Sequence, residues 1–269
     1  MNSLPCYDVY AIRYGEQLER PEGSTYLGGN ASKMIRGLDF FTYVIKGPIH
    51  TYVVDTGFNS DLSGEGGRSF LEEPATILSK IGIDPKKVDK VLLTHAHFDH
   101  VGNLDHYPNA NFSIHVEEMS SITGPDITFA PFRIAYHQRD TRRLVELLYE
   151  ERLSFYEGTI NQVAPGIEFH LIGGHSRGQM ILRVNTKRGW IVLASDAVHL
   201  YDEVELERPF AIFHDLQKMI EGYRTCMKLA GTRDFLISGH DPKVTDWYPA
   251  IAPEFGGRVL DLGVAPTVK

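Results

Sequence analysis

Histidine and aspartate side chains gather in one short stretch of the chain, between Thr94 and His100. The stretch contains His95, His97, Asp99 and His100. Neutral imidazoles and carboxylates bind zinc, iron or manganese, and so many titratable groups packed together would be costly without a metal. The mostly apolar run 88–94 before them predicts a buried strand. Because side chains two apart on an extended chain point the same way, we expect His95, His97 and Asp99 to converge.

Three further candidate ligands stand in the same setting. His175, Asp196 and His240 each come shortly after a brief apolar run. One such residue is more often a turn or cap residue, so each is weak evidence alone. Together with the first motif they supply enough ligands for two metal ions that share a carboxylate. The full candidate set is His95, His97, Asp99, His100, His175, Asp196 and His240.

The elements that must position these residues predict an α/β protein. Strand-like runs occur in both halves of the chain, at 40–45, 51–54, 112–115, 167–172, 180–185, 190–194 and 235–237. Helices are predicted at 74–81 and 215–229. This rhythm favours two mixed sheets that face each other, with helices outside. No Gly-x-Gly-x-x-Gly follows a strand, so a simple doubly wound fold is not expected.

Residues 117–164 differ in character from the chain around them. They mix proline and aromatic residues with a charged amphipathic helix predicted at 139–153. We expect one domain over residues 1–269, with 117–164 as an insertion that covers the pocket. Its aromatic side chains and one histidine are candidates for lining that pocket: Phe129, Phe132, Tyr136 and His137.

Composition restricts the kinds of partner. The 269 residues are 42% hydrophobic and 23% charged, as in an ordinary globular protein. A formal net charge of -8 argues against a nucleic-acid partner. Cys6 and Cys226 cannot form a disulfide framework, and neither a secretory signal nor a membrane-length apolar run is visible. A cytoplasmic protein that binds neither nucleic acid nor membrane is therefore expected.

The combined pattern His-x-His-x-Asp-His, then Gly-His, Asp and Gly-His, resembles the metallo-β-lactamase superfamily. The resemblance implies an αββα sandwich with two divalent metal ions at one edge, zinc first and iron or manganese as alternatives. Asp55 is similar to an early Asp of the family that stands behind the ligands. The resemblance implies this division of ligands: His95, His97 and His175 on one metal, Asp99, His100 and His240 on the other, and Asp196 between them.

Within the superfamily the chain looks like the N-acyl-homoserine-lactone lactonase group. Its length, its insertion before Gly174-His175 and its Asp196-Ala197 pair carry this likeness. The likeness implies hydrolysis of a cyclic ester by a hydroxide that bridges the metals, and a role in quorum quenching. Such lactonases have Tyr three residues after the bridging Asp, where this chain has His199. The sequence therefore does not predict which lactone is the substrate.

The resemblance also implies roles around the reacting ester. Asp99 would carry a proton to the leaving alkoxide. His199 or Tyr201, the nearest tyrosine, would donate a hydrogen bond to the substrate carbonyl. The expected partner is a small lactone or ester, and a homodimer is a candidate assembly.

Other activities of the superfamily fit less well. Flavodiiron oxygen reductases have Glu where this chain has His97, nucleases related to RNase Z are basic, and β-lactamases normally lack Asp at position 99. A scaffold protein would have lost ligands. The runner-up is a glyoxalase-II-like thioesterase, or a hydrolase of another small ester or cyclic amide. A thioesterase of that kind would need a basic helical C-terminal region, whereas residues 243–269 are poor in Lys and Arg.

Overall fold

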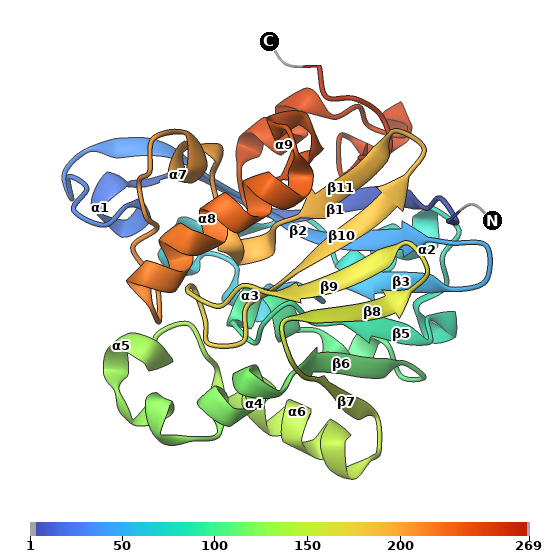
Figure 1. Ribbon diagram of the computed structural model, residues 1–269, viewed down its shortest axis with the longest axis horizontal. Helices are drawn as coiled ribbons and strands as arrows, with labels where there is room; N and C mark the ends of the chain where they lie inside the picture. Colours follow the sequence, from blue (N-terminus) through green and yellow to red (C-terminus); the bar gives the residue numbers. More distant parts are fainter. Residues whose placement is uncertain (1–3, 268–269) are drawn as a thin grey trace.

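Two mixed β-sheets pack face to face in the computed structural model, which describes residues 4–267 (Figure 1). The strands are β1 Asp8–Pro21, β2 Met34–Lys46, β3 Thr51–Val54, β4 Ser69–Phe70, β5 Lys90–Leu92, β6 Asn111–His115, β7 Leu153–Tyr156, β8 Ile160–Ala164, β9 Ile167–Leu171, β10 Met180–Thr186, β11 Gly189–Leu193, β12 Leu236–Ile237 and β13 Val259–Asp261. In the described part of the chain the first sheet has the order β13-β1-β2-β3-β5-β6-β7, with β4 beside β1. The second has the order β12-β11-β10-β9-β8.

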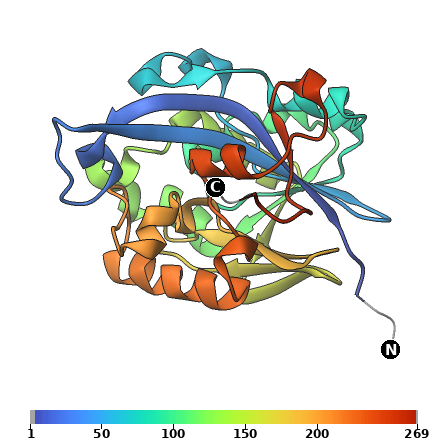
Figure 2. The same ribbon diagram turned by 90° about the horizontal axis from the view of Figure 1, so that it is seen from above.

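Helices cover the outer faces of both sheets, so the expected sandwich is confirmed (Figure 2). They are α1 Glu22–Thr25, α2 Pro74–Lys80, α3 Phe98–Val101, α4 Val116–Ile122, α5 Ala130–Arg133, α6 Gln138–Tyr149, α7 Tyr201–Glu205, α8 Leu216–Ala230 and α9 Pro242–Trp247. Figure 2 shows α8, in orange, on the outer side of the second sheet. None of the helices described is long and apolar enough to span a bilayer.

The first sheet is buried on both faces. In β2, Phe41 and Tyr43 belong to the apolar cluster between the sheets, whereas Val44 belongs to the cluster that includes Ile77 and Leu78 of α2. A strand buried on both sides reads as a continuous apolar run, which is why residues 40–45 show no polar alternation.

The parallel strands end at a common edge, where the predicted ligands follow. β3, β5 and β6 are parallel, with Val54 opposite Leu92 and Leu92 opposite Ser113. β11 and β12 of the second sheet are also parallel, with Leu193 opposite Ile237. Because parallel strands bring their carboxyl ends together, the loops after β3, β5, β11 and β12 meet at one edge of the sandwich.

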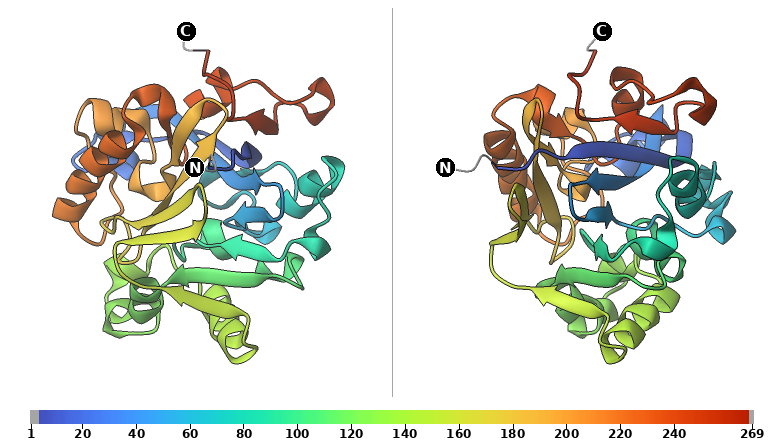
Figure 3. Two further views of the ribbon diagram at one scale, coloured as in Figure 1. Left: turned by 45° about the vertical axis from the view of Figure 1, so that its right-hand side comes forward. Right: turned by 90° about the vertical axis from the view of Figure 1, so that its right-hand side faces the viewer.

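The segment 117–164 is more than an insertion. The predicted helix 139–153 is wrong at its end, because α6 stops at Tyr149, Glu151 adopts a left-handed φ of 59°, and β7 begins at Leu153. β7 extends the first sheet beside β6, and β8 begins the second sheet beside β9. The segment therefore carries the chain from one sheet to the other, while α4 to α6, in green, lie at one end of the sandwich (Figure 3).

The domain expectation stands as a prediction. It covers residues 1–269, of which 1–3 and 268–269 lie outside the described residues.

Candidate metal centre

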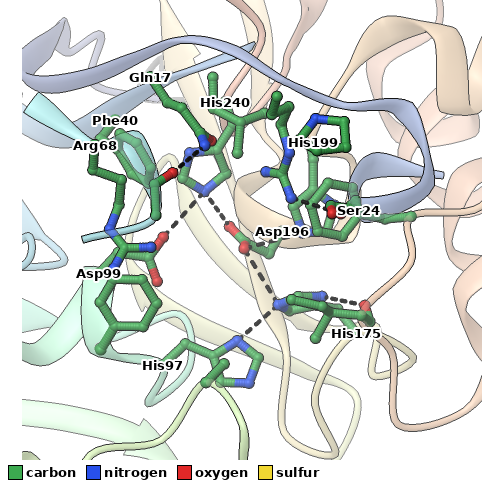
Figure 4. A pocket seen from close by; sticks show the side chains of 18 residues that line it. Gln17, Ser24, Phe40, Arg68, His97, Asp99, His175, Asp196, His199 and His240 are labelled. Atoms are coloured by element: carbon green, nitrogen blue, oxygen red, sulfur yellow. Dashed lines mark hydrogen bonds and ion pairs between the residues drawn. The ribbon is translucent and has the colours of Figure 1, made fainter. Parts of the chain in front are cut away.

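All seven predicted ligands lie at the edge where the parallel strands end, and all are buried. Their ligand atoms form two groups, each within 4.8 Å: His95, His97, His175 and Asp196 in one, Asp99, His100 and His240 in the other. Asp196 faces both groups. Its Oδ1 lies 3.1 Å from Nε2 of His100 and of His240, and its Oδ2 lies 3.3 Å from Nε2 of His175. Figure 4 shows Asp196 between His240 and His175.

The alternation expected along residues 95–99 is wrong at Asp99. The chain is extended at His97, but α3 begins at the next residue, so Asp99 lies in the first turn of a helix. The helical turn moves the Asp99 carboxylate away from His95 and His97. It lies instead with His100 and His240, 3.7 Å from Nε2 of His240.

The orientation of the imidazole rings fits a metal centre. Nδ1 of His175 donates to the Ile212 carbonyl at 3.0 Å, and Nδ1 of His240 donates to the Asp39 carbonyl at 2.9 Å. A ring whose Nδ1 carries the proton presents an unprotonated Nε2, the form that binds a metal. The buried Nε2 of His95 has no hydrogen-bond partner within residues 4–267. The residues present therefore fit two metal ions.

Asp55 holds the loop that carries the first motif. Its backbone has a φ of 60°, and its carboxylate accepts from the Thr94 backbone N–H at 2.8 Å and the Thr94 hydroxyl at 2.7 Å. Nδ1 of His100 lies 2.8 Å from Asp55 Oδ2. Asp55 thus orients His100 without facing the cluster, in the place that the resemblance implies.

Burial keeps the first group of histidines neutral. It lowers the pKa of His97 to about 4. Burial, reinforced by neighbouring histidines, also lowers the pKa values of His95 and His175 well below the ordinary range. Metal binding requires unprotonated imidazole, so these residues are in the binding form at neutral pH.

The family model of the metallo-beta-lactamase superfamily matches residues 41–221, more than half of the chain. The chain belongs to the metallo-beta-lactamase superfamily. The predicted family is thereby confirmed.

Curated relatives of this superfamily member include N-acyl homoserine lactonases. The one from Bacillus cereus is 28% identical over 167 residues, which are 62% of this chain and 61% of the relative. The one from Bacillus thuringiensis is 25% identical over 214 residues, 73% of this chain and 77% of the relative. The chain thus spans less than two thirds of the first relative. A crystal structure of a quorum-quenching N-acyl homoserine lactone lactonase has a TM-score of 0.74 to this chain at 20% sequence identity. The superposed part covers 90% of this chain and 94% of that lactonase, so the two share a fold.

Glu118 ties two ligand loops of this superfamily member together, and sequence reasoning missed it. Its buried carboxylate accepts from the Ala96 backbone N–H at 2.9 Å, between His95 and His97. It also accepts from the Ser176 hydroxyl and the Gly178 N–H, both at 2.8 Å, just after His175. A single Glu in the first turn of a helix carries no signal of such a role, because that position usually faces water.

His199 lies at the cluster, beside Asp196. Its ring stacks on Phe210, with centroids 3.6 Å apart, and its Nε2 lies 3.1 Å from Asp196 Oδ2. Nδ1 lies 3.3 Å from Oε1 of Glu203, a buried carboxylate that sequence reasoning also missed. Burial by itself lowers the pKa of His199. The charges of Glu203 and Asp196 outweigh this effect and raise the pKa to about 9. His199 is thus held with one ring nitrogen toward the pocket.

Tyr201 does not reach the pocket, so its predicted role at the substrate is wrong. Its hydroxyl donates to the Leu236 carbonyl at 3.1 Å, and its ring packs against Trp247. The side chain belongs to the apolar cluster between the sheets. The start of α7 at this residue turns the ring inward, away from Asp196.

A cavity of about 370 Å³ opens over the candidate ligands (Figure 4). Its wall comes mainly from β1, α1, β2, residues 66–68 and residues 210–212; only Ala135 comes from the segment expected to cover it. Phe132 and Tyr136 line a small side cavity with His97 and His175, while Phe129 is 58% exposed and His137 stacks on Phe98. The long arm of β1, absent from the sequence prediction, takes the covering role expected of residues 117–164.

Proposed function

We propose that this protein is a dinuclear metal-dependent hydrolase that opens a lactone. The observation that carries the proposal is the placement of Asp196, whose two oxygens lie 3.1–3.3 Å from histidines of both groups. One carboxylate between two sets of nitrogen ligands suits a pair of metal ions. The curated relatives named N-acyl homoserine lactonase support cyclic esters as the substrate class.

The ligand division implied by the family is part of the proposal. His95, His97 and His175 would hold one ion, Asp99, His100 and His240 the other, and Asp196 both. Imidazole and carboxylate donors without thiolate favour zinc, with iron or manganese as alternatives. When bound, two such ions supply an activated water and polarise an ester carbonyl.

The chain's own residues complete the reaction. His199 would donate from Nε2 to the substrate carbonyl oxygen, with Glu203 fixing the ring through Nδ1. Asp99, which lines the same cavity, would carry a proton to the leaving alkoxide. The lactone thereby becomes a hydroxy acid. Both His199 and Asp99 line the cavity, so both side chains face a substrate bound there.

Hydrolysis of a lactone panel by metal-loaded protein tests the proposal. The panel holds acyl-homoserine lactones of several chain lengths, simple γ- and δ-lactones and S-lactoylglutathione, with His97→Ala as the control. Opening of lactones by the unaltered protein and loss in the variant are expected. Turnover of the thioester alone would favour the glyoxalase-II-like alternative and overturn the lactonase assignment.

Three finer proposals accompany the activity. A quorum-quenching role follows only if acyl-homoserine lactones are among the substrates that are opened. Cytoplasmic location rests on the two free cysteines, Cys6 and Cys226. The homodimer is tested by light scattering of the purified chain.

A further inference from the structure

Two arginines line the same cavity as the candidate ligands. Arg20 lies near the end of β1, and Arg68 follows the glycine-rich turn at residues 64–67. Figure 4 shows Arg68 among the side chains that surround His240, Asp99 and Asp196. The chain carries a formal net charge of -8, so two cations at one pocket run against its overall balance.

Neither guanidinium is neutralised by a close carboxylate. Within residues 4–267, Arg20 makes no ion pair, and its polar partner is the Ser24 carbonyl at 2.6 Å. Arg68 has Glu65 at 3.6 Å, but that carboxylate is 60% exposed and screened by water. Nε of each arginine is buried and has no hydrogen-bond partner in the same range. Each guanidinium thus keeps N–H donors that no carboxylate in the described part of the chain accepts within hydrogen-bond distance.

The two side chains are held in place by apolar and backbone contacts. Arg20 rests against the ring of Phe210 at 5.2 Å, and Arg68 against Phe98 at 4.7 Å. Gln17 Nε2 donates to the Gly66 carbonyl at 2.5 Å and so joins β1 to the turn that carries Arg68. Gly66 has a φ of 57°, which favours glycine in this turn.

The arginines also lie close enough to affect each other. Burial, and then the charge of Arg68, lower the pKa of Arg20 to about 10, so Arg20 stays charged at neutral pH. Asp99 and Asp196 do not need the two arginines as counterions, since bound divalent ions would neutralise the charges of these carboxylates. Neither arginine has a carboxylate within hydrogen-bond distance among the described residues, so the cavity offers both cations to an anion.

We infer that Arg20 and Arg68 bind a carboxylate group on the substrate. A pair of guanidinium groups suits the two oxygens of a carboxylate. A cavity of about 370 Å³ admits a small ring with such a substituent, whereas a long acyl chain would have to leave it. The inference rests on the proposed function and narrows it to lactones that carry a negative charge.

Two γ-lactones of the same shape test the inference: 5-oxotetrahydrofuran-2-carboxylate and its uncharged carboxamide. For the metal-loaded protein we expect kcat/KM to be about 10-fold or more higher for the carboxylate. Arg20→Gln and Arg68→Gln should each lower the ratio of the two kcat/KM values about 10-fold, and Arg20→Lys should lower it less. The ratio is measured within one preparation, so a general loss of active protein cancels.

Arg224→Gln is the matched control, because it removes one positive charge from an arginine that is 73% exposed and does not line the cavity. Its ratio should equal that of the unaltered protein. Opening of both lactones with a ratio near one, or a ratio that the Arg20 and Arg68 variants leave unchanged, overturns the inference while the proposed function stands.

Calorimetric binding of tetrahydrofuran-2-carboxylate, which has no ester to hydrolyse, gives a second readout. Affinity should fall about 10-fold in Arg20→Gln and Arg68→Gln but not in Arg224→Gln. If no lactone is opened yet this loss is seen, the proposed function fails and the carboxylate site stands. If binding is equal in all variants, the carboxylate site fails.

Discussion

Three candidate ligands are fixed by a hydrogen bond at the ring nitrogen that faces away from the cluster. Backbone carbonyls hold Nδ1 of His175 and His240, and Asp55 holds His100. Glu118 does not touch a ligand side chain, but it fixes the backbone beside two of the ligand loops. Such outer contacts commonly change metal affinity 10- to 100-fold when they are removed.

Replacement of Glu118 by Gln should therefore weaken metal binding about 10-fold or more. Gln keeps the shape, but its amide nitrogen cannot accept, whereas both carboxylate oxygens of Glu118 accept hydrogen bonds from Ala96, Ser176 and Gly178. Competition with a chromophoric chelator measures the affinity. The adjacent Glu117→Gln is the control, since Glu117 pairs with Arg177 at the surface. Equal affinity in the two variants would show that Glu118 does not position the loops.

Substitutions of His199 and Tyr201 should have different effects on kcat and on stability. His199→Ala removes the expected donor to the carbonyl oxygen and should lower kcat about 100-fold with metal content retained. Tyr201→Phe removes a hydrogen bond to the Leu236 carbonyl, so we expect about 1 kcal/mol less stability and normal kcat. Steady-state kinetics and thermal unfolding measure both. A large loss of kcat in Tyr201→Phe would return that residue to the reaction.

The seven candidate ligands could be predicted because they form a dense motif and three strand-end residues in one sequence. Glu118, Glu203, Arg20 and Arg68 could not. Each is an isolated charged residue in a helix, strand or turn, where exposure to water is the usual outcome. Only tertiary packing brings these four side chains into the cluster or its cavity.

Among the elements, the apolar strands were predictable and the long arm of β1 was not. Residues 40–45 are a continuous apolar run, whereas β1 contains Arg13, Glu16, Gln17 and Glu19 and has a bulge between Arg13 and Gly15. The outer half of β1 pairs with β2 and leaves side chains in solvent, so it lacks the pattern of a core strand. The short α1 loop that follows depends on Glu22 for its shape.

Glu22 should make the stability of this loop depend on pH. Lys33, the Asn30 N–H and Arg208 lower its pKa to about 2 from 4.5. A lowered pKa gives stability that is complete above pH 4.5 and is lost as the pH falls toward 2. Glu22→Gln should therefore lower Tm near neutral pH, by an amount that shrinks between those limits.

Thermal unfolding from pH 7 to pH 2 measures the difference between the two proteins. Glu19→Gln, in the exposed part of β1 just before this loop, should show no such pH-dependent difference. A constant difference across the range would mean that the charge of Glu22 is not what holds the loop.

For the molecule as a whole, the cluster lies where the two sheets meet. His95 and Asp99 follow β5 of the first sheet, while Asp196 and His240 follow β11 and β12 of the second. The loops of the two sheets meet there, since Nε2 of His100 lies 3.1 Å from Oδ1 of Asp196. Metal ions bound here would connect the halves of the sandwich.

Removal of metal should accordingly lower the stability of the entire domain. A ligand present at 1,000 times its Kd stabilises the folded state by about 4 kcal/mol, which for a domain of this size corresponds to roughly 10 °C in Tm. Calorimetry before and after chelation, and after zinc is restored, measures the change. His97→Ala should respond less to chelation. A Tm unaffected by chelation in the unaltered protein would argue against ions that join the sheets.

The wall of the cavity and the candidate ligands come from different stretches of the chain. Most of the wall outside the cluster lies before residue 69, whereas every candidate ligand lies between residues 95 and 240. Substitutions in this part of the wall can therefore alter which molecules the cavity admits without replacing any candidate ligand, as long as the Asp39 carbonyl and the Asp55 carboxylate still hold His240 and His100. A chimera that receives only these wall residues from a relative, with Asp55 retained, should take on the relative's selectivity while it keeps its own candidate ligands.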